Sequence, residues 1–251
     1  MKRAGEGADL AQVYADLWRP ARAAFLRNAG QIDPLLQSGA ADARRGLTVI
    51  FRPQPAVAAR VGAWLAEMAP DEPAQYYYTP AQLHVTVLSL FTATPDFGPY
   101  FARLPRYLAA LDAALATLPP FAVAFRGVTA SPSTVMVQGF PDDHTLERAR
   151  AALRTAIAAA GLGGDLDRRY RLVTAHLSAL RLRVPLTDPA GFVARLDRAR
   201  HLDFGVTQVD EVLLVANDWC MTPGVVEVVR RYPLTSTQPV CAITRRSALT
   251  A

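Results

Sequence analysis

The sequence predicts an α+β fold in which one structural unit occurs twice. Residues 83–91 (LHVTVLSLF) alternate between apolar and polar side chains and are rich in β-branched residues, which is typical of a strand with two different faces. Residues 57–68 carry apolar side chains at helical spacing. The order strand, helix, histidine-bearing strand appears over 46–91 and again over 134–182. We interpret this as a degenerate internal duplication; the alternative is a chance likeness between two α/β segments.

The N-terminal part of the chain has the pattern of a helical extension. Apolar residues follow helical spacing within 9–27, although Pro20 interrupts the pattern. The next stretch, 28–45, is rich in Gly, Asp, Gln and Ala, as expected of a connection. We therefore divide the chain into a helical N-terminal extension, 1–45, and a main domain, 46–251.

The two units of the main domain also agree in their spacing. Gly46 precedes His84 by 38 residues, and Thr134 precedes His176 by 42 residues. A proline ends the leading strand of each unit, in FRP and in GFP. The elements expected in chain order are a strand over 46–52, a helix over 57–68, a strand over 83–91, a helix over 99–117, strands over 121–128 and 134–140, a helix over 143–160, a strand over 172–182, a helix over 189–200 and strands over 205–216 and 225–234.

Composition and charge restrict the class of protein. With 51% hydrophobic and 20% charged residues, the chain has the composition of a folded globular protein, and its net charge of +5 favours anionic partners. Cys220 and Cys241 lack the spacing of a zinc or redox pair, which indicates a reducing compartment. Residues 1–10 have no apolar signal region, and no apolar run is long enough to span a membrane. We expect a soluble, cytoplasmic monomer without membrane partners.

Two short triplets carry the chemistry. Because side chains alternate along a strand, His84 and Thr86 should share one face, and His176 and Ser178 should repeat this arrangement. Two imidazoles can supply one base and one acid on opposite sides of a phosphate, while the hydroxyls bind its non-bridging oxygens. We predict that His84 and His176 form the acid/base pair of one active site, which needs no metal and no cofactor.

The segments LHVTVLSL and AHLSALRL resemble the motifs of the two-histidine (2H) phosphoesterases, which include the 2'-5' RNA ligase-like proteins and RNA 2',3'-cyclic phosphodiesterases. The resemblance covers about 46–234. It implies two pseudo-symmetric lobes, each an antiparallel sheet with helices on its outer face, with the histidine-bearing strands facing a central cleft. It also implies that His84 and His176 are general acid and base and that Thr86 and Ser178 hold the phosphate.

The resemblance extends to one further basic residue. Arg181 matches an arginine that follows the second triplet in the family, whereas Leu88 and Ser89 stand where the family often has a basic residue after the first. The implied activity is metal-independent hydrolysis of a 2',3'-cyclic phosphate, on an RNA end or a small nucleotide. A 2'-5' phosphodiesterase or ligase, and a non-catalytic RNA or nucleotide binder with the same cleft, remain alternatives.

Other candidate residues have two interpretations each. The run Tyr76, Tyr77 and Tyr78 could stack a base, with Tyr77 as the candidate substrate-binding residue, or it could pack a turn. The basic cluster Arg168, Arg169 and Arg171 could steer a phosphate or form a solvated loop. We interpret Trp219 as a core residue, and His144 and His201 as structural.

Rival functions lack their motifs in the sequence. A metallohydrolase would need three or four ligands, and no His-x-x-x-His, His-Glu-x-x-His or Asp-x-His group is present. No helix is basic enough to suggest binding to duplex DNA. The partner that the resemblance implies is an RNA 2',3'-cyclic phosphate end or a cyclic nucleotide.

Overall fold

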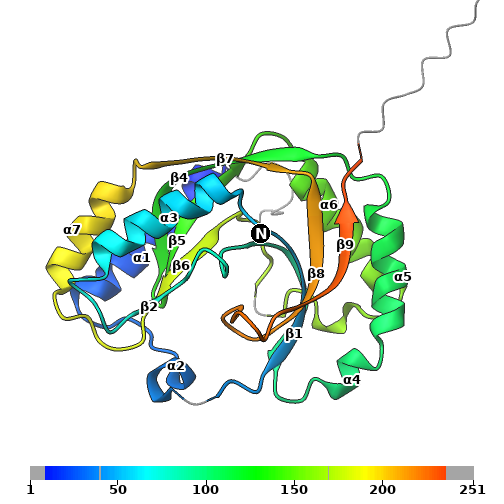
Figure 1. The fold of residues 1–251 in the computed structure, drawn as a ribbon, viewed down its shortest axis with the longest axis horizontal. Coiled ribbons are helices and arrows are strands. Elements are labelled where there is room, and N and C mark those ends of the chain that lie inside the picture. Colours follow the sequence, from blue (N-terminus) through cyan, green and yellow to red (C-terminus); the bar gives the residue numbers. More distant parts are fainter. Residues whose placement is uncertain (1–8, 40, 169, 236–251) are drawn as a thin grey trace, which may run out of the picture.

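The computed structural model describes residues 9–39, 41–168 and 170–235. Within these residues, nine strands form one antiparallel sheet in the order β7-β4-β5-β6-β3-β1-β8-β9, and β2 pairs with β6 outside this path (Figure 1). The strands are β1 (Arg45–Phe51), β2 (Tyr76–Tyr77), β3 (Val85–Thr94), β4 (Phe121–Ser131), β5 (Thr134–Pro141), β6 (Leu177–Arg181), β7 (Asp203–Val209), β8 (Glu211–Asn217) and β9 (Glu227–Pro233).

Helices cover the outer face of this curled sheet (Figure 1). They are α1 (Leu10–Leu26), α3 (Pro55–Met68), α4 (Gly98–Phe101), α5 (Leu104–Leu115), α6 (Thr145–Ala159) and α7 (Pro189–Ala199). The short helix α2 (Pro34–Ser38) buries no residue and lies apart from them (Figure 1). The helices α1, α3 and α7 lie beside β4, β5 and β6, whereas α4, α5 and α6 lie beside β1, β8 and β9. The sheet therefore has two halves, each with its own helical cover.

The two halves meet where the histidine triplets begin. Strand β6 ends one half and β3 ends the other, and the only residue pair between them in the described ladder is Val85 with Leu177. By contrast, β3 pairs with β1, and β6 with β5, over several residues. His84 and His176 each precede one member of this pair in the chain. The junction between the halves thus places the two triplets side by side.

The helix of each repeated unit covers the half that contains the other unit's strands. Helix α3 follows β1 but packs against β7 and β6, and α6 follows β5 but packs against β3. As a result, each unit contributes a helix to the cover of its counterpart. This exchange links the two halves through the chain as well as through the sheet.

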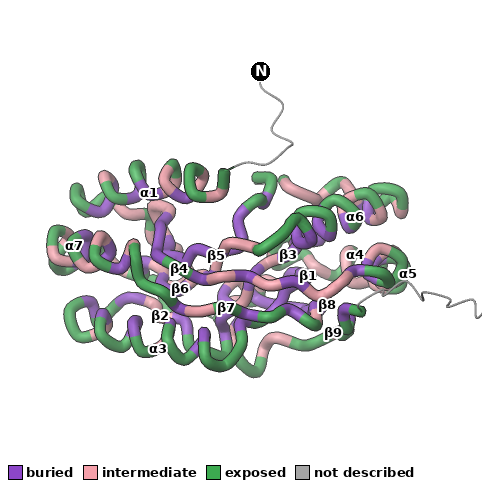
Figure 2. Tube along the Cα trace, turned by 90° about the horizontal axis from the view of Figure 1, so that it is seen from above, coloured by how far each residue is buried: buried purple, intermediate pink, exposed green. Residues whose placement is uncertain are grey.

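A continuous apolar core lies between the helices and the sheet. Figure 2 shows buried residues concentrated on the inner sides of the helices and along the strands, with exposed residues on the outer helix surfaces. Helix α1 contributes Trp18, Ala21 and Phe25 to the same core as the strands. It continues through Pro20, where we expected an interruption, because its buried face packs against β4 and α7. The N-terminal segment thereby shares the core of the main sheet.

The structure confirms the α+β class and the antiparallel sheet, and it corrects several boundaries. The expected strand over 205–216 is two strands, since β7 pairs with β4 in one half and β8 with β1 in the other. The expected helix over 99–117 is the two helices α4 and α5. The expected strand over 172–182 is shortened to β6, Leu177–Arg181, because only this part of the segment pairs with neighbouring strands. The described residues contain no helix long and apolar enough to cross a membrane.

Candidate active site

A cavity of about 200 Å³ lies at the junction of the two halves. Both predicted triplets contribute to its wall, since His84, Thr86, His176 and Ser178 all line it. The other lining residues are Thr48, Tyr78, Leu88, Ser89, Thr92, Ala93, Asp165, Asp167, Arg168, Tyr170, Leu172, Arg181, Asn217, Asp218, Trp219 and Met221. The structure therefore brings the four triplet residues together in one place.

His84 is held in one orientation by a backbone carbonyl. Its Nδ1 lies 2.8 Å from the carbonyl oxygen of Gln82. Because a carbonyl can only accept, Nδ1 must carry a proton, and in the neutral ring Nε2 then has the free lone pair. Burial lowers the pKa of His84 to about 4, and the charges of Arg52 and Arg181 act in the same direction. Without a bound anion, His84 is neutral at pH 7 with Nε2 as an acceptor.

His176 is held by the hydroxyl of Thr174, which, unlike a carbonyl, can donate or accept a hydrogen bond. Its Nδ1 lies 2.8 Å from the hydroxyl oxygen of Thr174. A hydroxyl group can donate or accept, so this partner suits either the neutral or the protonated ring. Burial and the positive charges of Arg150 and Arg181 lower the pKa of His176 to about 3, and His84 acts in the same direction when its own ring is protonated. The two rings thus differ in the partner that fixes Nδ1.

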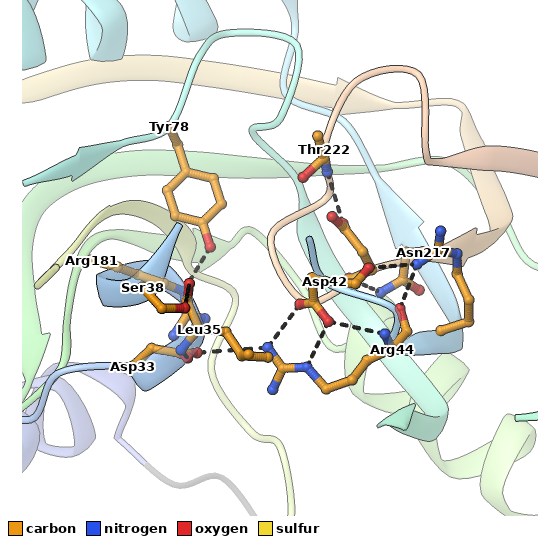
Figure 3. A network of polar contacts seen from close by, with 11 residues as sticks. Asp33, Leu35, Ser38, Asp42, Arg44, Tyr78, Arg181, Asn217 and Thr222 are labelled. Carbon is orange, nitrogen blue, oxygen red and sulfur yellow. Dashed lines mark hydrogen bonds and ion pairs between the residues drawn. The ribbon is translucent and has the colours of Figure 1, made fainter. Parts of the chain in front are cut away.

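Arg181 brings a positive charge to the same cavity. Its Nε donates a hydrogen bond to the hydroxyl oxygen of Tyr78 at 2.8 Å (Figure 3). Its guanidinium carbon also lies 5.4 Å from the ring centroid of Trp219. These contacts orient the guanidinium, and an arginine in a fixed fork is well suited to a phosphate.

A second arginine, Arg44, contacts the ring of Trp219, which lines the cavity. Nε and Nη2 of Arg44 donate to the carboxylate of Asp42 at 2.9 and 2.8 Å, and Nη2 lies 3.8 Å from a carboxylate oxygen of Asp33 (Figure 3). The charge of Arg44 is therefore matched by two carboxylates. The guanidinium carbon of Arg44 lies 4.8 Å from the ring centroid of Trp219. The segment that precedes β1 thereby stabilises the tryptophan that lines the cavity.

The tyrosine run separates into two sides, as expected of neighbouring strand residues. Tyr77 does not line the cavity; its hydroxyl donates to the carbonyl oxygen of Glu72 at 3.0 Å. Tyr78, next in the chain, lines the cavity and contacts Arg181. The structure therefore places Tyr78, rather than the predicted Tyr77, in the cavity wall. Strand alternation, with Tyr76 opposite Arg181 in the register, is the signal that separates them.

Of the remaining candidate residues, some line the cavity and others do not. Trp219, which we expected in the core, lines the cavity, and so does Arg168, which pairs with Asp165 at 2.8 Å. Arg171 does not line it. His144, which contacts Glu147 at 3.1 Å, and His201 lie outside it as well. Arg169 and Cys241 lie outside the described residues.

Potential metal ligands do not cluster in the described ranges. No group of three or more His, Cys, Asp or Glu side chains there could hold a metal ion. Cys220 is buried, and burial raises the pKa of its thiol to about 11.

Two histidine triplets in one cavity, at the junction of a curled antiparallel sheet, are the arrangement of a two-histidine phosphoesterase. The family model of the 2'-5' RNA ligase superfamily matches residues 53–218. The chain belongs to this superfamily.

Solved structures have a similar fold. The protein TT0787 of Thermus thermophilus is 21% identical with a TM-score of 0.56, and the match covers 76% of this chain and 97% of that chain. E. coli LigT complexed with 3'-AMP is 16% identical with a TM-score of 0.55, and the match covers 76% of this chain and 99% of that chain. No curated protein matched the sequence at a significant level. The match thus spans almost the whole of these proteins, while about a quarter of the present chain lies outside it.

Proposed function

We propose that this protein hydrolyses a 2',3'-cyclic phosphate, on an RNA end or a small nucleotide, by metal-independent acid/base catalysis. The observation that carries the proposal is the meeting of His84 and His176 in one cavity, each with Nδ1 occupied at 2.8 Å. In both rings Nδ1 is held by the protein, and Nε2 has no hydrogen-bond partner among the described residues. Such a pair can move one proton to and one proton from the oxygens of a phosphoester.

The anion-binding part of the site supports a phosphate substrate. Arg181 provides the charge, and Thr86 and Ser178, which line the same cavity, have hydroxyls that can bind non-bridging oxygens where charge accumulates. The positive charges that lower the pKa of both histidines also favour an anion between them. A bound phosphate would offset these charges and raise both pKa values toward the range in which imidazole works as acid and base.

The partners of Nδ1 favour a division of roles. His84 keeps its proton on Nδ1, so its Nε2 can accept a proton from water as the water oxygen attacks phosphorus. His176, protonated in the substrate complex with Nδ1–H directed at Thr174, gives its Nε2 proton to the ribose oxygen as the P–O bond breaks. One P–O bond forms, one breaks, and the product is a 2'- or 3'-monophosphate with a free neighbouring hydroxyl. Proton exchange with solvent restores both rings.

A second function is favoured by the family match. The matched superfamily is named for 2'-5' RNA ligation. A 5'-hydroxyl that attacks the cyclic phosphate in place of water would form a 2'-5' linkage with the same roles of the two histidines, and cleavage of that linkage back to a cyclic phosphate would exchange them. Nucleotide ligands are consistent with either activity, since a structural neighbour, E. coli LigT, is known in complexes with 3'-AMP and ATP.

The test is a panel of substrates with and without EDTA. We expect purified protein to open cyclic-ended oligonucleotides or free 2',3'-cyclic nucleotides, with unchanged rates in EDTA, and His84→Ala and His176→Ala to lose this activity. Cleavage of 2'-5' linked dinucleotides in preference to cyclic phosphates would favour the second function. A wild-type protein that is inert on every substrate but still binds 3'-AMP would indicate a non-catalytic nucleotide binder.

A further inference from the structure

Helix α6 directs a buried arginine at the back of the candidate active site. Arg150 is 4% exposed, and all four of its hydrogen bonds go to backbone carbonyls. It does not line the cavity. The sequence does not predict the role of Arg150, because its hydrogen-bond partners are remote in the chain and are brought together only by the fold.

The carbonyl partners of Arg150 belong to both histidine segments. Nη2 donates to the carbonyl oxygens of Thr86 and Thr174, both at 2.8 Å. Nε and Nη1 donate to those of Val87 and Val173, both at 3.0 Å. Thr86 lies two residues after His84, and Thr174 lies two residues before His176 and binds its ring. One guanidinium therefore joins the backbones that carry the two candidate catalytic rings.

This link matters because the sheet itself joins the two segments weakly. The direct pairing of β3 with β6 consists of Val85 and Leu177 alone among the described residues. Tyr14 also binds the second segment, since its hydroxyl accepts from the backbone N–H of Ala175 at 3.1 Å. Only Arg150 makes side-chain hydrogen bonds to both segments within the described chain.

Burial of the Arg150 charge costs free energy, so its presence is not explained by apolar packing of the core alone. Burial lowers the pKa of the Arg150 guanidinium to about 10. An apolar side chain would fill a helix-sheet interface without that desolvation cost. A lysine would present a point charge and could not reproduce a planar fork to four carbonyls.

We propose that Arg150 is a positioning residue for the acid/base pair: its guanidinium holds the His84 and His176 segments at the separation that a bound phosphate must span. The catalytic part of this proposal rests on the proposed function. The groups that face His176 are Arg150 from α6, His84 beside β3 and Arg181 on β6. Arg150 therefore also places a positive charge near His176, whereas the charges that act on His84 are those of Arg52 and Arg181.

The kinetic test compares Arg150→Lys and Arg150→Ala with two controls on the same helix. Arg148→Lys changes an exposed arginine, and Leu153→Ala removes buried apolar packing. We expect kcat to fall roughly 10- to 100-fold in both Arg150 variants with a smaller change in KM, because sub-ångström misplacement affects the reaction more than binding. Low concentrations of guanidinium ion should restore part of the kcat of Arg150→Ala and none in Leu153→Ala. Wild-type kcat in Arg150→Lys, or a loss no greater than in Leu153→Ala at equal thermal destabilisation, would overturn the proposal.

A second measurement does not depend on activity. By NMR, amide hydrogen exchange at Val85 and Leu177 should accelerate about tenfold or more in Arg150→Lys and stay unchanged in Arg148→Lys, since loss of about one or two hydrogen bonds weakens the junction by that order. If the wild type is inert but this acceleration is seen, the proposed function fails and the structural link stands. If exchange at the junction is unaffected in Arg150→Lys, the link itself is disproved.

Discussion

The Nδ1 atom of His176 lies 2.8 Å from the hydroxyl oxygen of Thr174, two residues earlier in the chain. Thr174 is buried, and its carbonyl oxygen accepts from Arg150. The same residue therefore connects the ring of His176 with the guanidinium behind the site. His84 has no such side-chain partner at Nδ1, because a backbone carbonyl occupies that place.

Replacement of Thr174 should affect His176 alone. Thr174→Val keeps the volume but removes the hydroxyl, so we expect kcat for a cyclic phosphate to fall roughly 3- to 10-fold, the value of one hydrogen bond. Thr174→Ser keeps the hydroxyl and should retain most of the activity. Equal kcat values for the valine and serine variants would show that this contact does not support the ring.

The assignment of base and acid can be tested with the leaving group. A nitrophenolate leaves phosphorus without needing a proton, unlike a ribose oxygen. On a nucleoside nitrophenyl phosphate, His176→Ala should therefore lose much less activity than on a cyclic phosphate, while His84→Ala should be impaired on both. If the two variants lose the same factor on each substrate, the division of roles is wrong.

Binding of an anion should be accompanied by proton uptake. The pKa values of His84 and His176 are lowered to about 4 and about 3, so both rings are neutral at pH 6 in the free protein. A phosphate group between them raises both pKa values, and protons are then taken from the buffer. Titration calorimetry with 3'-AMP at pH 6, in buffers of different ionisation enthalpy, should report this uptake. It should diminish in His84→Ala and in His176→Ala; identical heats in all buffers would contradict the expected shift.

The same shifts predict how acid affects stability. Because the folded-state pKa values lie below the usual 6.5, the unfolded chain binds more protons as pH falls below about 6.5, and the free energy of unfolding decreases toward pH 4. His176→Ala removes one of these groups. Its melting temperature, relative to wild type, should therefore be higher at pH 4.5 than at pH 7.5, as measured by thermal melts. A difference that is the same at both pH values would argue against a lowered pKa.

Arg181 should determine affinity for the phosphate. Arg181→Met keeps the apolar stem of the side chain but removes the charge near the cavity, so the Kd for 3'-AMP should rise roughly 10- to 100-fold, the range for hydrogen bonds to charged groups. Arg148→Met, at an exposed site on α6, serves as the matched control. Similar Kd values for the two variants would remove Arg181 from the binding site.

The sequence predicts the parts of the site that depend on local pattern. His84, Thr86, His176 and Ser178 are recognisable because strand alternation places the members of each triplet on one face. Trp219 lines the cavity through contacts with Arg181 and Arg44, which are remote in the chain. No local pattern contains those contacts, so its role could not be predicted.

Long-range pairing also explains the errors in the fold. The sequence predicts one strand over 205–216, but β7 and β8 pair with strands in different halves of the sheet. Arg150 looks like one of several arginines on an amphipathic helix, and only the junction of β3 and β6 reveals why it is buried. The exchange of α3 and α6 between the two halves is likewise a property of packing and not of either repeated unit.

The central claim is that His84 and His176 act as one acid/base pair, and a double-mutant comparison tests it most directly. We predict that kcat/KM for a 2',3'-cyclic nucleotide falls about 10²- to 10⁴-fold in His84→Ala and in His176→Ala. In the double variant it should fall little further, because residues that act as a unit are not additive. Full activity in either single variant, or losses that multiply in the double variant, would contradict the claim.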